Sequence, residues 1–345
     1  MSYQTSIGKR RSSQSRLALG VMLGLALLAG DDADARGWNY EGRVLARGLL
    51  GSSGSTTGPD GAIYVAEGAG GQVTRIDPKN GRKRVVAKNL PAANPAVGLG
   101  GPIDVAFIGD TLYVLVTLVN EFGGPEDGIY RIDSPDEPVL IADIGSFASQ
   151  NPPPPDFPID LKNGVQFAML PADQGFLVTD GHHNRVLHVP LEGDITVVKQ
   201  YGNSVPTGLA GTFATAYVGQ LGPVPNLPED GTVNAFGLLD ADNDRTIASG
   251  VPMIVDVEFG PHGDLFALSQ GEYDPGTPPG APARPKTGSL LKVRADGSFC
   301  TISTKIDRPT SLDFSGSNAY VTTLTGEVLQ YRGLTLVSDL ICGWR

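Results

Sequence analysis

The segment Gly58-Pro-Asp-Gly-Ala-Ile-Tyr-Val65 joins a tight turn to a short apolar strand, and the chain repeats this pattern. Each copy contains an aromatic or large apolar anchor residue, and the anchors are Tyr64, Tyr113, Leu177, Tyr217, Phe266 and Tyr320. The intervals between successive anchors are 49, 64, 40, 49 and 54 residues. A repeat with such a period is typical of propellers and other repeat architectures.

Three further strand patterns accompany the anchor strand. One strand follows it, as in Val73-Thr-Arg-Ile76, and another precedes it, as in Pro102-Ile-Asp-Val105. A last strand completes the unit, as in Arg84-Val-Val-Ala87. Four short strands per unit, separated by Gly, Pro, Asp and Asn turns and repeated six times, predict an all-β, six-bladed β-propeller with antiparallel blades. We assign residues 36–345 to this single domain, because a toroid adds core blade by blade.

One strand-like segment, Arg43–Leu49, stands before the first complete repeat. We expect it to pair into the last blade beside Thr335–Ile341. That pairing would close the ring and remove the two exposed sheet edges of an open array.

The N-terminus has the form of a secretory signal peptide over residues 1–35. Four basic residues precede a thirteen-residue apolar run from Leu17 to Ala29, and a polar stretch ends in Ala33-Asp-Ala35. The run is shorter than the roughly 20 residues that a membrane-spanning helix needs. We therefore expect a secreted or periplasmic protein with no membrane span in its mature chain; an uncleaved anchor is the alternative.

The chain has two cysteines, Cys300 and Cys342. Because an exported chain reaches an oxidising compartment, we favour a disulfide between them, which would lie close to the seam of the ring. Two small buried apolar side chains are the alternative.

The composition excludes some functions. The formal net charge is −11 at pH 7, and no Lys/Arg run longer than the three residues Arg82–Arg84 occurs after the signal peptide. Nucleic-acid binding needs a larger basic footprint, so we exclude it. The chain also has no Gly-x-Ser-x-Gly elbow, Walker loop or dinucleotide-binding fingerprint.

The first strand of each propeller blade lies nearest the axis, so polar residues at its start become candidates for a ligand site in the channel. Superposing the repeats places Asp104 and Asp256 there, in the opposite second and fifth blades, together with Asn163, Thr207 and Thr310. Two carboxylates in one lumen repel, and oxygen ligands of this kind suit Ca²⁺ or Mg²⁺. The alternative is that each Asp caps its own turn or binds water.

Asp180-Gly-His182-His183 concentrates half of the four histidines in one turn. Histidine can act as a ligand or a general base, and we select Asp180 and His182 as ligand-binding candidates. Adjacent residues point apart, and no His-x-x-x-His spacing completes a transition-metal site. Surface turn residues are the alternative.

Several motifs in order resemble the ScyD/ScyE family. They are Gly58-Pro-Asp-Gly-Ala-Ile-Tyr-Val-Ala-Glu67, Gly101-Pro-Ile-Asp-Val105, Asn163-Gly-Val165 ahead of Leu177-Val-Thr-Asp-Gly181, Val205-Pro-Thr-Gly-Leu209 and Tyr217-Val-Gly-Gln-Leu-Gly-Pro-Val-Pro225. The resemblance implies an exported propeller, related to the NHL-type and streptogramin-lyase-like propellers, encoded near genes for an indole-phenol sunscreen pigment. It implies no reaction. Ser52–Thr57 departs from the family's usual Pro-Arg-Gly-Leu-Ala-Phe.

Two functional hypotheses follow. The first is a binding or accessory propeller that recognises a small molecule or a protein at one face or in the channel. The second is a lyase-, lactonase- or hydrolase-type enzyme that uses a divalent cation held by Asp104 and Asp256. The repeat favours neither, since propellers perform many functions.

Overall fold

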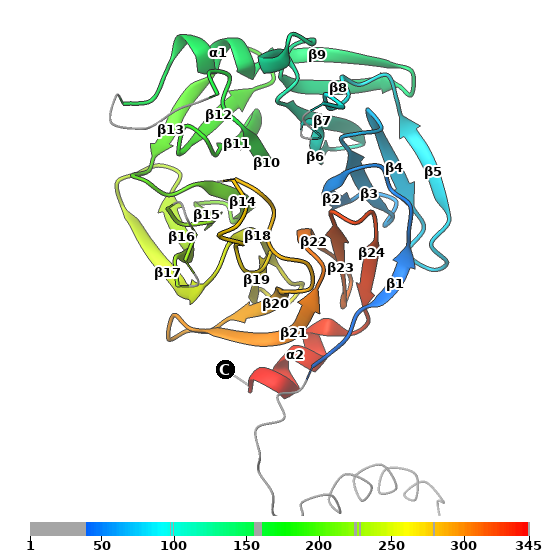
Figure 1. The fold of residues 1–345 in the computed structure, drawn as a ribbon, viewed down its shortest axis with the longest axis vertical. Coiled ribbons are helices and arrows are strands. Elements are labelled where there is room, and N and C mark those ends of the chain that lie inside the picture. The colour runs from blue at the N-terminus through cyan, green and yellow to red at the C-terminus, as the bar shows by residue number, and fades with distance from the viewer. Residues whose placement is uncertain are drawn as a thin grey trace, which may run out of the picture. The chain divides into compact units, whose positions relative to one another are not determined.

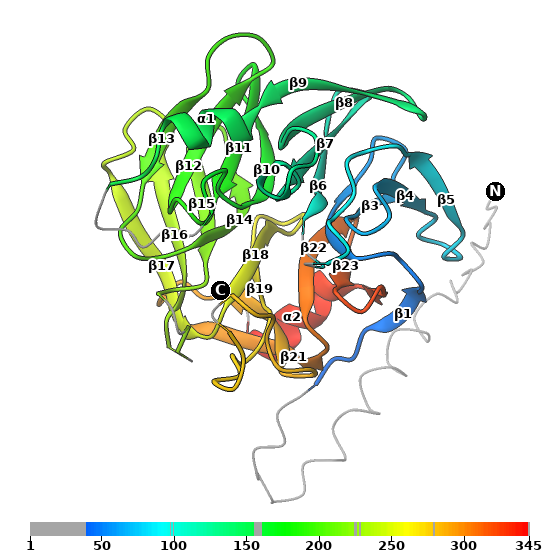
Figure 2. The same ribbon diagram turned by 45° about the horizontal axis from the view of Figure 1, so that its top comes forward.

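The repeats form the blades of a six-bladed β-propeller. The computed structural model describes residues 39–343 except 97, 99, 155–160, 224–225, 228 and 279. The predicted signal peptide lies outside the described residues. The described strands form six four-stranded antiparallel sheets around a common axis, with the first strand of each sheet innermost (Figures 1 and 2).

Five sheets are built from consecutive strands, and the sixth combines both ends of the domain. The first two sheets contain β2 (Ser52–Thr57), β3 (Ile63–Glu67), β4 (Gln72–Ile76) and β5 (Lys83–Ala87), then β6 (Gly101–Ile108), β7 (Thr111–Thr117), β8 (Gly128–Ser134) and β9 (Glu137–Asp143). The next two contain β10 (Gln166–Ala172), β11 (Gly175–Asp180), β12 (Arg185–Pro190) and β13 (Thr196–Gln200), then β14 (Pro206–Gly211), β15 (Thr215–Gln220), β16 (Gly231–Gly237) and β17 (Asp244–Val251). The last two contain β18 (Ile254–Phe259), β19 (Leu265–Ser269), β20 (Gly288–Val293) and β21 (Phe299–Ile306), then β22 (Pro309–Ser315), β23 (Asn318–Thr323), β24 (Val328–Tyr331) and β1 (Arg43–Ala46).

The N-terminal strand closes the ring, but not beside the segment that we expected. β1 pairs antiparallel with β24, with Arg43 opposite Gln330. Thr335–Ile341 is not a strand; it lies within helix α2 (Leu334–Cys342). The chain leaves β24 through Gly333 at φ 60°, and the apolar Leu334 and Ile341, two helical turns apart, pack in one core cluster. The apolar spacing there is therefore helical rather than alternating.

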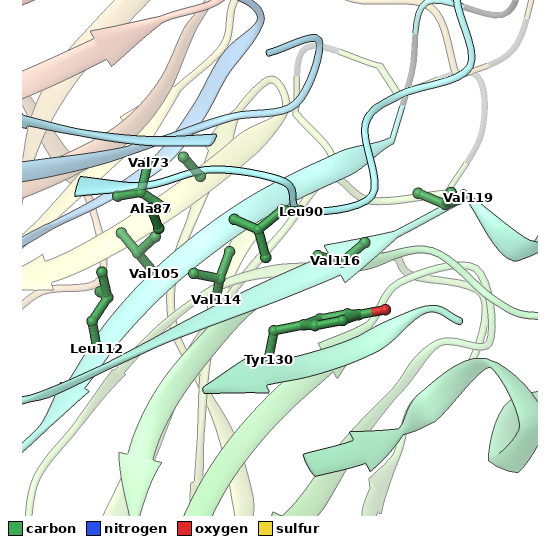
Figure 3. Packing of buried hydrophobic residues seen from close by; sticks show 10 residues of the cluster. Val73, Ala87, Leu90, Val105, Leu112, Val114, Val116, Val119 and Tyr130 are labelled. Carbon is green, nitrogen blue, oxygen red and sulfur yellow. The ribbon is translucent and has the colours of Figure 1, made fainter. Parts of the chain in front are cut away.

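The hydrophobic core lies between neighbouring sheets. Val73 and Ala87 of the first sheet pack with Val105, Val114 and Tyr130 of the second (Figure 3). Edge-on aromatic pairs recur at such interfaces, with ring centroids 4.8 Å apart for Tyr64–Phe107 and 5.1 Å apart for Tyr113–Phe176 and Tyr217–Phe259. The recurring aromatic anchors of the sequence thus bind each blade to the next.

The long connections share one end of the propeller, which we call the loop face. Because the first strand of a sheet begins where the second ends, the connections to the next sheet and between the second and third strands meet there. The connections of ten or more residues are 88–100, 118–127, 144–165, 221–230 and 270–287, and the third includes α1 (Ile144–Gln150). The opposite face carries shorter turns, such as 58–62 and 109–110.

A covalent link joins the last blades. Cys300 of β21 and Cys342 at the end of α2 form a disulfide with their Cα atoms 5.8 Å apart. Among the described residues, no helix is long and apolar enough to cross a membrane.

Candidate functional site

Each innermost strand has a register irregularity near its start. The residue that follows this irregularity occupies an equivalent position in all six sheets. In each sheet, the next residue along the chain pairs with the equivalent residue of the second strand, as Val105 pairs with Val114. The aligned residues are Gly54, Asp104, Ala168, Gly208, Asp256 and Ser311. Asp104 and Asp256 therefore occupy equivalent positions, as the superposition of the repeats predicted. In the third sheet this position is taken by Ala168, and Asn163 lies in the preceding connection.

The carboxylates of Asp104 and Asp256 join consecutive blades. Asp104 Oδ1 accepts from the backbone N–H of Val105 at 2.8 Å, and Oδ2 accepts from that of Met169 in the next sheet at 2.7 Å. Asp256 has the same arrangement, with Val257 at 2.9 Å and Leu312 at 2.7 Å. Both carboxylates are therefore anchored by hydrogen bonds within the propeller.

Hydroxyl groups make equivalent links at the other predicted positions. Thr207 Oγ1 lies 2.7 Å from the carbonyl oxygen of Ile254 in the fifth sheet. Thr310 Oγ1 donates to the carbonyl oxygen of Ser53 in the first sheet at 2.8 Å. These two side chains therefore stabilise the contacts between neighbouring blades.

Two further carboxylates near the axis were missed by the sequence analysis. Glu258 lies two residues beyond Asp256 on β18, and Asp313 lies on neighbouring β22. Asp313 Oδ1 accepts from the N–H of Phe314 at 2.6 Å, whereas its buried Oδ2 has no hydrogen-bond partner among the described residues. Residues two apart share a face of a strand, so Asp256-Val-Glu258 could have indicated this acidic pair.

Burial dominates the protonation of this cluster. It raises the pKa of Asp256 and of Asp313 to about 7 each. It also raises the pKa of Asp104 and of Glu258 well above their usual values, and the neighbouring carboxylates add to both shifts. The charged forms of these groups are disfavoured because they lose hydration and repel one another.

We predict that this cluster makes stability fall as pH rises. The folded pKa values of Asp256 and Asp313 exceed the ordinary 3.8, so the folded protein holds protons that the unfolded chain has released. Stability from this source is fully present below about pH 4 and is lost as pH rises through 7. An Asp313→Asn variant should gain melting temperature relative to the wild type between pH 5.5 and pH 8. An unchanged difference between the two proteins would contradict this prediction.

Asp180 lies in a different environment, fully buried at the loop-face end of β11. Its Oδ2 lies 2.8 Å from Arg185 Nε and 3.3 Å from His183 Nδ1. Arg185 donates through Nη1 to the carbonyl oxygen of Asn151 at 2.6 Å, and its guanidinium lies over the Phe147 ring. The network holds the 144–165 connection against the third sheet.

The histidine that joins this network is His183, which is 1% exposed, rather than the selected His182. His183 Nε2 lies 3.3 Å from the carbonyl oxygen of Leu161. The turn from Asp180 brings residue i+3 back towards residue i, and this spacing could have identified His183. His182 is partly exposed in the same turn at the loop face.

Asn163 lies apart from the channel carboxylates, at the junction of the second and third sheets. Its backbone N–H donates to Glu121 Oε2 at 2.9 Å, and its Nδ2 donates to Asn120 Oδ1 at 2.9 Å. Both partners belong to the 118–127 connection. The residues that we grouped by sequence thus divide between the channel and the rim of the loop face.

Comparison with known proteins identifies the architecture but no family. No protein-family model matches the chain, and no curated protein matches it in sequence. Among solved structures, a gluconolactonase from Xanthomonas campestris aligns with a TM-score of 0.57 at 14% identity, covering 84% of this chain and 88% of that one. The calcium-binding protein regucalcin from Agrobacterium tumefaciens aligns with a TM-score of 0.56 at 14% identity, covering 86% and 94%.

A third similar structure comes from a nidogen/laminin complex, with a TM-score of 0.51 at 13% identity and coverage of 76% and 85%. At these identities the likeness shows the fold alone. The β-propeller fold is thus supported, and β-propellers have diverse functions.

The sequence predicted a divalent ion between Asp104 and Asp256 in the channel. Among the described residues, no group of three or more His, Cys, Asp or Glu side chains could hold a metal ion. Asp104 and Asp256 both have their carboxylate oxygens engaged with backbone N–H groups. The carboxylates of this pair therefore have structural partners of their own, and a channel ion stays a prediction.

Proposed function

We propose that this propeller is an exported binding or accessory protein that recognises a small molecule or a partner protein at its loop face. The observation that carries the proposal is the grouping of the long connections at that end, above a channel whose anchored side chains join the blades. Long loops on a rigid scaffold are where binding residues concentrate. The alternative, a cation-dependent lyase, lactonase or hydrolase, requires ligands that the channel pair alone does not supply.

Two histidines of the third blade allow a matched test. His182 lies in a turn of the loop face, and His188 lies near the opposite face, with Nε2 3.0 Å from the carbonyl oxygen of Asp173. Because of the ScyD/ScyE resemblance, the first probes are indole and 4-hydroxyphenyl compounds. For a probe that the wild type binds, we expect His182→Ala to weaken binding about tenfold, equivalent to about 1.4 kcal/mol. His188→Ala should leave the affinity unchanged. Titration calorimetry measures both.

Equal effects of the two variants would contradict recognition at the loop face. The enzyme alternative is tested separately with glucono-δ-lactone in the presence of CaCl₂ or MgCl₂. Hydrolysis that needs the cation and is lost in Asp256→Asn would replace the binding proposal with the alternative.

A further inference from the structure

The 118–127 connection folds around one buried side chain, Asp127. Asp127 is 0% exposed, and its Oδ1 accepts from the backbone N–H groups of Val119 at 2.6 Å and Asn120 at 3.2 Å. The connection turns through the 3₁₀ segment Asn120–Phe122 and through Gly123 at φ 80°. Asp127, the last residue of the connection, thus binds the backbone near the first residues of the same connection.

The charge of Asp127 is not balanced by any described side chain. Its Oδ2 is buried without a hydrogen-bond partner, and neither Asp127 nor Glu121 takes part in an ion pair within the described part of the chain. Glu121 adds a second negative charge that acts on Asp127. A buried carboxylate without an opposite charge is strongly unfavourable, so this position calls for a cation.

Oxygen donors from two blades meet around it. Glu121 Oε2 accepts from the backbone N–H of Asn163, whose side-chain amide donates to Asn120 Oδ1. The backbone at Gly145 borders the same space, since a Cβ there would lie 3.5 Å from Asp127 Oδ2 and 3.7 Å from Asn163 Cβ. The side-chain NH₂ group of Asn163 therefore lies next to oxygen atoms, and these oxygen atoms would attract a cation.

We propose that Asp127, Glu121, Asn120 and Asn163 form a binding site for a calcium-type divalent cation at the junction of the second and third blades. Two carboxylates neutralise the ion, and a rotation of the Asn163 amide exchanges its NH₂ for its oxygen without moving other atoms. Ca²⁺ accepts such irregular oxygen sets, whereas Mg²⁺ demands nearly octahedral geometry. The four residues include no His or Cys, the usual ligands of transition metals.

The site goes beyond the proposed function and predicts ion-dependent stability. Binding joins the 118–127 connection to Asn163, so the ion stabilises the folded state alone. Sites with few charged ligands in extracellular modules have dissociation constants of about 10⁻⁴–10⁻³ M. We expect one Ca²⁺ per chain by calorimetry, and a melting temperature several degrees higher in about 10 mM CaCl₂ than in EDTA.

Asp127→Asn removes the charge and keeps the shape. This variant should lose the Ca²⁺-dependent shift and melt in EDTA no lower than the wild type. Asp230→Asn is the matched control. Like Asp127, Asp230 precedes a glycine at the start of the third strand of a sheet. Its carboxylate also accepts a hydrogen bond from a backbone N–H of its own connection, that of Leu227 at 2.9 Å. It should keep the full shift.

Three results would overturn the proposal. They are a wild-type melting temperature unaffected by about 10 mM CaCl₂, a Ca²⁺ shift retained in both Asp127→Asn and Asp256→Asn, and a shift retained in Asp127→Asn but lost in Asp256→Asn, which would place the ion in the channel. If Asp127→Asn fails to fold, Glu121→Gln provides the same test from a partly exposed position. Calcium binding and ligand recognition at the loop face can each fail independently.

Discussion

Replacing Gly208 with alanine should lower the free energy of unfolding by about 3 kcal/mol, at the upper end of typical overpacking costs. A Cβ at Gly208 would lie 2.4 Å from Asp256 Cα, 2.5 Å from Asp256 Oδ1 and 2.9 Å from the backbone nitrogen of Val257. Two of these atoms belong to the backbone of the next blade, so a side-chain rotation cannot relieve the clash. Urea unfolding followed by circular dichroism measures the loss.

The same result is expected at the opposite side of the ring. A Cβ at Gly54 would lie 2.1 Å from Asp104 Oδ1 and 2.7 Å from the carbonyl oxygen of Ile103. Gly202→Ala is the control, because nothing lies within 4 Å of its Cβ position, and its effect should stay within about 0.5 kcal/mol. A Gly208→Ala protein as stable as the Gly202→Ala protein would show that the blades do not approach so closely.

Loss of the Cys300–Cys342 disulfide should cost about 4 kcal/mol, as the chain-entropy model gives for a closed loop of this length. The cysteines are 42 residues apart, and the link fastens α2 against the outer strand of the fifth sheet. The buried Leu334 of α2 packs in the same cluster as Ile302 and Ile306. The double variant Cys300→Ala/Cys342→Ala should therefore unfold at a clearly lower urea concentration than the oxidised wild type.

Reduction provides the control for this prediction. Dithiothreitol should shift the wild type towards the midpoint of the double variant and leave the variant itself unchanged. A wild type whose unfolding midpoint is insensitive to the reductant would mean that the bond does not constrain the unfolded chain.

Much of the fold could be predicted because its signals are local. Alternating apolar residues and turn residues determine where a strand begins and ends, and their sixfold recurrence determines the number of blades. The strand that pairs with β1 was harder to predict from the sequence. Thr335–Ile341 and Val328–Tyr331 are both apolar segments near the C-terminus, and only the backbone turn at Gly333 separates a strand from a helix.

The candidate site was predicted less completely, because its residues depend on contacts between blades. Asp104 and Asp256 lie near the starts of their strands as predicted, yet one of the two N–H groups that bind each carboxylate lies 65 or 56 residues away in sequence. In the third blade, the Asn163-Gly-Val motif suggested a register four residues earlier than the observed one. A motif comparison does not detect such a shift when the connection before the strand is long.

The repeat pattern alone determined the architecture, since the twofold alternation of a strand and the conformational preferences of turn residues act within a few positions of the chain. Tertiary structure decided which polar groups are bound and which are left without a partner. Asp104 and Asp127 are both buried aspartates, but one meets the backbone of the next blade whereas the other keeps an unpaired oxygen beside Glu121. The partner of Asp104 in the next blade is a property of the closed ring, because Met169 lies 65 residues away in sequence, whereas Asp127 is bound by backbone N–H groups of its own connection.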